Sequence, residues 1–358
     1  MRFVTLACLC CWLCLTVGVS AQDASSGILP ASALPVDELG QLRAEVDMLK
    51  QYISRPTADP VPLDAFADES EGGLELFAGY DVVFANPHIK ESFQTTTLNV
   101  VPPTTLSLHP FEFDYDPSSR IWIGARSASG VGFRARYWNF DGGAAPVSRQ
   151  ATPTQLPGAS AVTVIYPANI LAVIPGDTLI ASDRLAVQTL DLEGTVSFCL
   201  NHTELTGAAG LRYAQIEQEN SAQVISLFAP GSLNWSRNFS GIGPSLAIDG
   251  RHPIGTTGLS VVANARGALL FGHKTIQRSV TGDVTPTPGP PNVALRDADE
   301  VTAAVEMGLG AEWEMYSGEA GIFTIRGMYE GQLWTDAGAP TLTFLGFEGF
   351  TVGLVWRR

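Results

Sequence analysis

The sequence predicts an all-β protein, a transmembrane antiparallel up-and-down β-barrel of about 10–12 strands with a short N-terminal periplasmic helix. Apolar residues alternate with small or polar residues over segments much longer than the five or six residues typical of soluble strands. Long connections also alternate with short ones along the chain. A net charge of −15 excludes a typical nucleic-acid-binding protein, which needs a basic surface.

Residues 1–21 have the pattern of a secretory signal peptide. Arg2 precedes an apolar run, and Val19-Ser20-Ala21 supplies the small residues that favour cleavage after Ala21. The alternative is an uncleaved membrane anchor, because the run is about long enough to span a bilayer. Four of the five cysteines lie in this leader, so Cys199 has no partner for an internal disulfide.

Residues 22–54 contain a short helix with the spacing of a coiled coil. Its apolar residues recur at the a and d positions and are Leu39, Leu42, Val46, Leu49 and Ile53. So short a helix is marginal in water alone. It either joins copies of the chain into a homotrimer or folds back on its own domain. Residues 55–72, rich in proline and acids, are predicted to be a linker.

The barrel is predicted over residues 73–358, and residues 300–316 show its alternation best. One face carries Val301, Val305, Leu309 and Trp313, and the other carries Glu306 and glycines. In a membrane barrel the apolar face contacts outer-membrane lipid and the other lines the lumen. Ten strands are predicted, at 73–84, 119–127, 131–140, 184–200, 204–217, 235–251, 258–274, 300–316, 320–334 and 344–356.

The lengths of the connections predict which end of the barrel carries only short turns. Short turns alternate with long connections at 85–118, 141–183, 218–234 and 275–299. Short periplasmic turns and long external loops are typical of outer-membrane barrels. Residues 88–116 could hold an extra hairpin, which would bring the strand number to twelve.

Charged residues at inward positions are the candidate functional residues. They are Arg126, Arg134, Arg136, Asp191, Glu193, Arg212, Asp249, Arg251, Arg266, Glu306, Glu312, Glu314, Arg326 and Glu330. Opposed charges across a lumen create a transverse field that orients polar solutes. Alternatively, they pair and fill a narrow barrel. The histidines are scattered and no nucleophile motif appears, so no catalytic residue, metal or cofactor is predicted.

Several short motifs occur in order along the predicted strands. They include Gly132-Phe133-Arg134-Ala135-Arg136-Tyr137-Trp138, Gly210-Leu211-Arg212-Tyr213 and Gly241-Ile242-Gly243-Pro244. These segments resemble the pore-forming major outer-membrane proteins of the Legionella type. With the segments around them, they span about residues 74–356. The resemblance implies a barrel that forms water-filled pores. One difference is the end of the chain, Trp356-Arg357-Arg358, because such barrels usually end on an aromatic residue.

The sequence therefore predicts a bacterial outer-membrane porin, not an enzyme, for passive diffusion of small hydrophilic solutes or ions. The alternative is a plugged barrel that acts as an adhesin or envelope structural protein through its long external loops. Conductance of the purified protein separates the two functions.

Overall fold

The computed structural model describes residues 73–89, 94–99, 105–109, 111–150, 160–166, 169–173, 176–226, 230–282, 292–335 and 344–358. The predicted signal peptide, the N-terminal helix and the linker lie outside these residues. The chain divides into two units, Met1–Asp68 and Glu69–Arg358, and the second contains the whole described fold. Among the described residues, no helix has the length and apolarity needed to cross a membrane.

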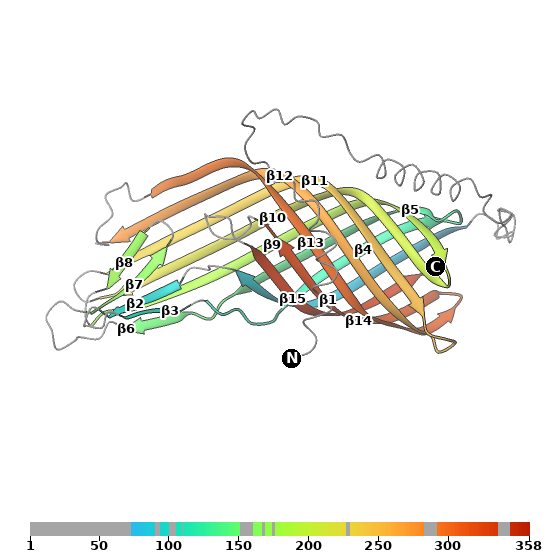
Figure 1. The fold of residues 1–358 in the computed structure, drawn as a ribbon, viewed down its shortest axis with the longest axis horizontal. Helices are drawn as coiled ribbons and strands as arrows, with labels where there is room; N and C mark the ends of the chain where they lie inside the picture. Colours follow the sequence, from blue (N-terminus) through green and yellow to red (C-terminus); the bar gives the residue numbers. More distant parts are fainter. Residues whose placement is uncertain are drawn as a thin grey trace, which may run out of the picture. The chain divides into compact units, whose positions relative to one another are not determined.

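Ten antiparallel strands form a closed ring (Figure 1). In ring order they are β1 (Leu74–Ile89), β4 (Asp116–Ser127), β5 (Val131–Gly143), β9 (Thr178–Leu200), β10 (Thr203–Ile225), β11 (Gly231–Pro253), β12 (Leu259–Gly282), β13 (Asn292–Gly318), β14 (Gly321–Trp334) and β15 (Leu345–Arg357). β15 pairs with β1 and closes the ring. The predicted barrel is confirmed, and the ring has ten strands.

The remaining strands lie at the loop end of the barrel. β6 (Val147–Gln150) pairs with β9 beyond the end of β5. β2 (Gln94–Asn99), β3 (Thr105–His109), β7 (Ser160–Tyr166) and β8 (Asn169–Val173) form a separate four-stranded sheet in the order β3-β2-β7-β8. The suspected extra hairpin is thus β2–β3, but it joins this second sheet and adds no strand to the ring.

Short turns connect strands at the opposite end. One two-residue turn joins β9 to β10 through Asn201 and His202, which have φ values of 47° and 67°. Positive φ at both central residues is the requirement of a type I′ turn, whose twist matches that of the flanking strands. The first and last ring strands also meet at this end, where the backbone of Leu76 exchanges hydrogen bonds of 2.6 and 2.8 Å with Arg358.

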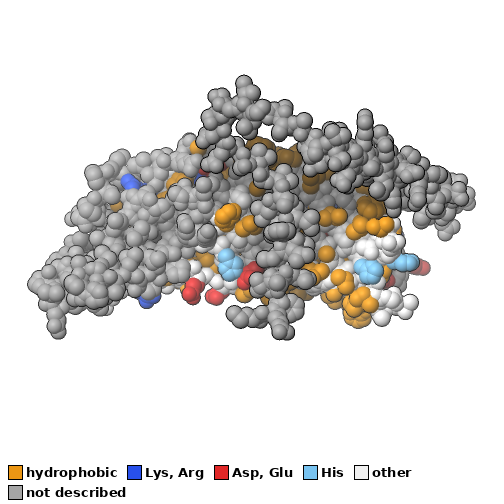
Figure 2. All heavy atoms as spheres, viewed as in Figure 1, with side chains coloured by type: hydrophobic (Ala, Val, Ile, Leu, Met, Phe, Trp, Pro, Cys, Tyr) orange, Lys and Arg blue, Asp and Glu red, His pale blue; other side chains and the backbone are white. Residues whose placement is uncertain are grey.

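An apolar belt surrounds the outer surface of the ring. On β9 it runs from Leu190 to Leu200, and on β13 it includes Leu309 and Trp313, which are 62% and 55% exposed. Ten residue steps of about 3.4 Å at a tilt near 45° cover about 24 Å. This height matches the apolar band of about 25 Å that outer-membrane barrels present to lipid. Figure 2 shows hydrophobic side chains on the visible outer surface of the barrel.

β9 to β13 continue beyond the belt, and there the polarity of their faces inverts. On β10, Leu211 and Tyr213 point outward within the belt, whereas Ile216 and Val224 point inward above it. Above the belt, the outward positions on this strand are polar from Gln215 to Gln223. Apolar residues therefore face lipid in the lower part of the strand and a protein core in the upper part.

The inversion corrects two sequence expectations. Residues 218–234, predicted to be a long connection, are mostly strand, since β10 ends at Ile225 and β11 begins at Gly231. The inner face was expected to carry polar and charged residues, but its upper part also holds a cluster of buried apolar side chains. Part of the hydrophobic content therefore lies inside the barrel and not against lipid.

Candidate functional site: the charged barrel interior

The middle of the barrel is filled by a layer of ion pairs, called here the ionic layer. It consists of Asp81, Arg120, Arg136, Asp191, Glu193, Arg212, Arg266, Glu306, Arg326 and Glu330. Strand alternation aims each of these side chains inward, because both of its neighbours in the strand face outward. Their layer lies at the height of the apolar belt, so no bulk solvent surrounds the barrel there.

The ionic layer joins opposite walls of the barrel. Arg136 on β5 donates from Nη2 to Oε2 of Glu306 on β13 over 3.0 Å. In the ring of ten, β5 and β13 are five strands apart in either direction. Arg120 on β4 makes a bidentate contact with Glu330 on β14, at 2.8 and 2.6 Å. Direct pairs of this kind leave no open lumen between the partners.

Asp191 lies at the centre of the layer. Arg212, its neighbour in the strand register, donates from Nε and Nη2 over 2.6 and 3.0 Å. Arg266 donates to the same carboxylate over 2.9 Å, and Arg136 lies 3.6 Å from it. The side chains of Asp191 and Arg212 are both 0% exposed. Charges buried this deeply are stable only when each is paired and hydrogen-bonded.

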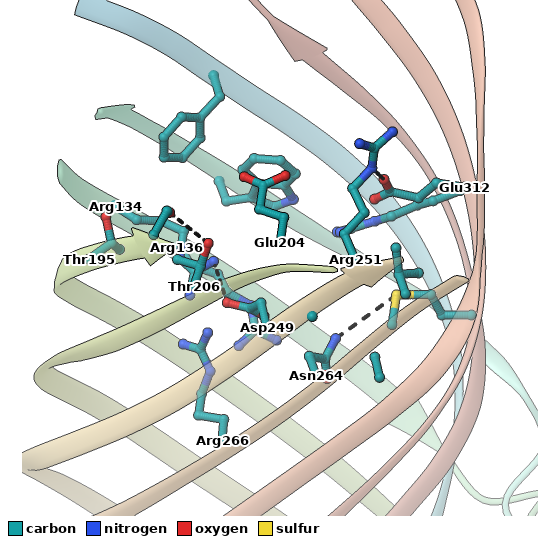
Figure 3. A pocket seen from close by; sticks show the side chains of 18 of the residues that line it. Arg134, Arg136, Thr195, Glu204, Thr206, Asp249, Arg251, Asn264, Arg266 and Glu312 are labelled. Carbon is teal, nitrogen blue, oxygen red and sulfur yellow. Dashed lines mark hydrogen bonds and ion pairs between the residues drawn. The ribbon is translucent and has the colours of Figure 1, made fainter. Parts of the chain in front are cut away.

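Below the ionic layer, towards the short turns, lies a cavity of about 170 Å³, called here the vestibule. Figure 3 shows charged side chains projecting into it from several strands. Arg134 pairs with Asp249 at 2.9 Å, and Arg126 pairs with Glu75 and Glu204 at 2.7 and 2.5 Å. The Glu75 side chain is 34% exposed and that of Asp191 is 0%, so the vestibule opens at the short-turn end and closes at the ionic layer.

The charges of the ionic layer and the vestibule balance among the described residues. Nine arginines pair with nine carboxylates. The arginines are Arg120, Arg126, Arg134, Arg136, Arg212, Arg251, Arg266, Arg326 and Arg357, and the acids are Glu75, Asp81, Asp191, Glu193, Glu204, Asp249, Glu306, Glu312 and Glu330. This interior is neutral, so the chain's net charge of −15 arises elsewhere.

Above the ionic layer, an apolar septum crosses the barrel. Its side chains are buried, and include Val83, Trp138, Phe140, Leu185, Val187, Ile216, Leu270, Trp334 and Phe347. The ring of Phe347 on β15 lies 5.5 Å from that of Trp138 and 5.2 Å from that of Phe140, both on β5. β4 and β1 separate these two strands in the ring. The contacts therefore cross the interior, and Phe111 and Phe113 pack into the same core.

The structure places all the sequence-predicted site residues on inward positions of the ring. Thirteen of them belong to the paired network, while Glu314 has no ion pair among those of the described residues. Five network members were not predicted: Glu75, Asp81, Arg120, Glu204 and Arg357. Alternation could have found them. Asp81 lies between the outward belt residues Tyr80 and Val82, and Arg120 shares the parity of Arg126.

The described residues contain no group of three or more His, Cys, Asp or Glu side chains that could hold a metal ion. Each carboxylate of the ionic layer contacts an arginine. The chemistry of this interior is therefore mutual neutralisation across the barrel.

Comparisons with solved structures return outer-membrane barrels at low similarity. The outer membrane protease OmpT from Escherichia coli is 9% identical with a TM-score of 0.40, covering 79% of this chain and 97% of that chain. The Pseudomonas putida toluene transporter TodX is 8% identical with a TM-score of 0.26, covering 79% and 89%. These values carry no inference about activity. No curated protein matches the sequence.

The family comparison is more specific. Residues 194–354 match the model of the Legionella pneumophila major outer membrane protein precursor family. The matched segment runs from the middle of β9 to β15 and includes Arg212, Arg266 and Glu306. The resemblance drawn from the sequence motifs is confirmed over these residues. The chain is an outer-membrane β-barrel protein, and over residues 194–354 it matches the Legionella major outer membrane protein family.

Proposed function

We propose that the protein is a closed, non-catalytic outer-membrane barrel that anchors a folded β-structure at the cell surface, in an adhesive or envelope-structural role. The contact between Arg136 and Glu306 carries this proposal, because it joins opposite walls at mid-barrel. A pore for hydrophilic solutes needs a continuous wet path. In the part of the chain that the structure describes, the ionic layer and then the apolar septum block such a path.

The extension beyond the belt supports a surface role. β9 to β13 there form a sheet with a mainly polar outer face and an inner face that buries apolar residues together with polar groups such as Asp183 and Asn220. β2, β3, β7 and β8 add a second sheet built from the two longest connections. The barrel therefore holds ordered structure outside the membrane, which suits contact with a surface partner or a neighbouring envelope component.

Solute flux into proteoliposomes tests the closed barrel. Wild-type protein should leave vesicles as impermeable to small sugars as protein-free vesicles. A variant with Arg136→Ala, Trp138→Ala, Phe140→Ala and Phe347→Ala removes cross-lumen contacts and should admit sugars. Wild-type flux above that of protein-free vesicles would overturn the proposal. In cells, loss of the protein should weaken surface attachment or envelope integrity and leave growth on scarce small solutes unchanged.

A gated pore is the second candidate, and the vestibule favours it. This charged cavity leads from the short-turn end to the ionic layer, so displacement of the ionic layer and of the septum side chains would connect it to the other side. In an open state, Glu306, Glu312 and Glu314 would line the path. Charge reversal at these positions should then change ion selectivity, and unchanged selectivity would exclude them from the conducting path.

A further inference from the structure

A groove of about 820 Å³ lies on the extension beyond the belt, at β9 to β12, and its lining includes Asn220, Trp235 and Arg278. Two rows of outward side chains cross these four strands in register. One row is Ser182, Ser221, Asn234 and Ser279, and the other is Arg184, Glu219, Ser236 and Gln277. At strand spacings of about 4.8 Å, each row is about 14 Å long.

The groove consists mainly of hydroxyl and amide groups. Six of the eight side chains in the two rows are Ser, Asn or Gln, and each of these can both donate and accept hydrogen bonds. The two charged members lie close together, with Arg184 Nη1 3.9 Å from Glu219 Oε2. Arg184 also pairs with Asp141 at 2.6 Å. The two rows thus present many uncharged donors and acceptors and little net charge, and Arg278 adds one cation to the groove lining.

This chemistry excludes several kinds of partner. A nucleic acid requires a basic surface, and acyl chains require an apolar one. Protein interfaces concentrate exposed aromatic residues at their centres, whereas the aromatic residue in this groove lining, Trp235, is buried at 3% exposure and the outward side chains of both rows are polar. A neutral saccharide offers closely spaced hydroxyl groups that match such rows of donors and acceptors.

The position of the groove indicates where that saccharide comes from. The outer surface continues without a break from Tyr213, at the edge of the lipid-facing belt, through Gln215 and Glu217 to Glu219. Six residue steps of about 3.4 Å at a tilt near 45° place Glu219 about 14 Å above the belt. This height lies beyond the acyl chains, beside the headgroups of the outer leaflet. The groove is therefore continuous with the lipid interface.

We propose that this groove binds the saccharide headgroup of a glycolipid in the outer leaflet. The lipid's acyl chains would pack on the apolar belt below, and its sugar rings would lie across the two polar rows. The inference goes beyond the proposed function, and its test does not depend on whether the barrel conducts.

Full-length refolded protein can be tested against phosphatidylethanolamine vesicles with and without rough lipopolysaccharide. Lipopolysaccharide should bind and raise the unfolding temperature of the protein, while phosphatidylethanolamine alone should not. Ser221→Trp and Ser236→Trp fill the groove from neighbouring strands, and each should weaken binding about tenfold. Gln223→Trp is the matched control, since this exposed residue lies on β10 outside the groove lining and should bind as wild type.

Several outcomes would contradict the proposal. Equal binding by the filled and control variants would remove the groove from the interaction. Equal stabilisation by phosphatidylethanolamine alone would indicate ordinary lipid contact. Equally tight binding of the deacylated saccharide would assign the groove to a soluble glycan. Loss of binding on chelation of divalent cations would indicate phosphate bridging in place of sugar recognition.

Discussion

Arg136 on β5 and Glu306 on β13 come from diametrically opposite strands of the ten-stranded ring, and they share a direct hydrogen bond of 3.0 Å. Both side chains are nearly inaccessible, at 13% and 8% exposure. A pair that spans the barrel fixes the separation of its walls and occupies the space in which solutes would pass. The barrel interior is therefore a structural core built from charges.

Removal of one buried partner should destabilise this core strongly. Arg212→Met would leave Asp191 and Glu306 without one of their arginines inside the barrel. Loss of one member of a buried network costs about 3–5 kcal/mol. We expect a large fall in the urea midpoint of refolded protein in lipid vesicles, with a loss of unfolding free energy of this size.

Arg184→Met is the control for that variant. Arg184 pairs with Asp141 and Glu219 on the outer surface, and its side chain is 57% exposed. Exposed pairs contribute about 0–1 kcal/mol, so this variant should unfold almost as wild type does. Equal losses in the two variants would show that burial does not govern the ionic layer.

Asp183 should make stability depend on pH. It lies on β9 beyond the belt, 2% exposed, and accepts hydrogen bonds from Gln218 at 3.1 Å and Asn220 at 3.0 Å. Burial raises the pKa of this carboxyl group from 3.8 to about 7. The folded state therefore holds the proton more tightly than the unfolded state. The stability that this proton contributes is complete below the unfolded pKa and declines as pH rises through the folded one.

Asp183→Asn should accordingly stabilise the protein above pH 7 and leave it nearly unchanged below the unfolded pKa. The gain above pH 7 should be a few kcal/mol, at about 1.4 kcal/mol per pKa unit. Urea unfolding across this pH range measures it. A difference between variant and wild type that does not vary with pH would show that Asp183 does not titrate in the folded state.

Close packing on the inner wall should make any substitution of Gly310 destabilising. A methyl group at this position would overlap the carbonyl oxygen of Gly327 and the side chain of Met328. Gly310→Ala should cost about 1–3 kcal/mol through strain. Gly267→Ala should be neutral, because no atom lies within 4 Å of the added methyl group. The temperature at which each variant loses its folded-barrel migration on a denaturing gel measures this difference. It should be lower than wild type for Gly310→Ala and equal to wild type for Gly267→Ala.

Much of the fold could be predicted because strand alternation has a single period. The outward set Val301, Val305, Leu309 and Trp313, with Glu306 and Glu312 inward, follows from position alone on β13. The inward charged residues could therefore be predicted strand by strand. The spanning requirement also forces the sheet to close, which explains why alternating connection lengths sufficed to predict a ring.

The contacts within the interior could not be predicted in the same way. Arg136 meets Glu306 because ring closure brings β5 opposite β13, and alternation within a strand carries no information about partners across the barrel. The apolar septum was also missed. Beyond the belt the surrounding medium changes from lipid to water, so residues such as Ile216 and Leu185 turn inward. This inversion interrupts the pattern that marks a membrane strand, and the predicted strands therefore stopped short.

Conductance across a planar lipid bilayer tests the closed barrel most directly. Wild-type protein should produce no discrete conductance steps, because the ionic layer and the apolar septum fill the interior. The variant with Arg136→Ala, Trp138→Ala, Phe140→Ala and Phe347→Ala should produce steps under the same conditions, which shows that the barrel inserts and that the removed side chains close it. Discrete steps from the wild-type protein would contradict the closed barrel and establish the pore.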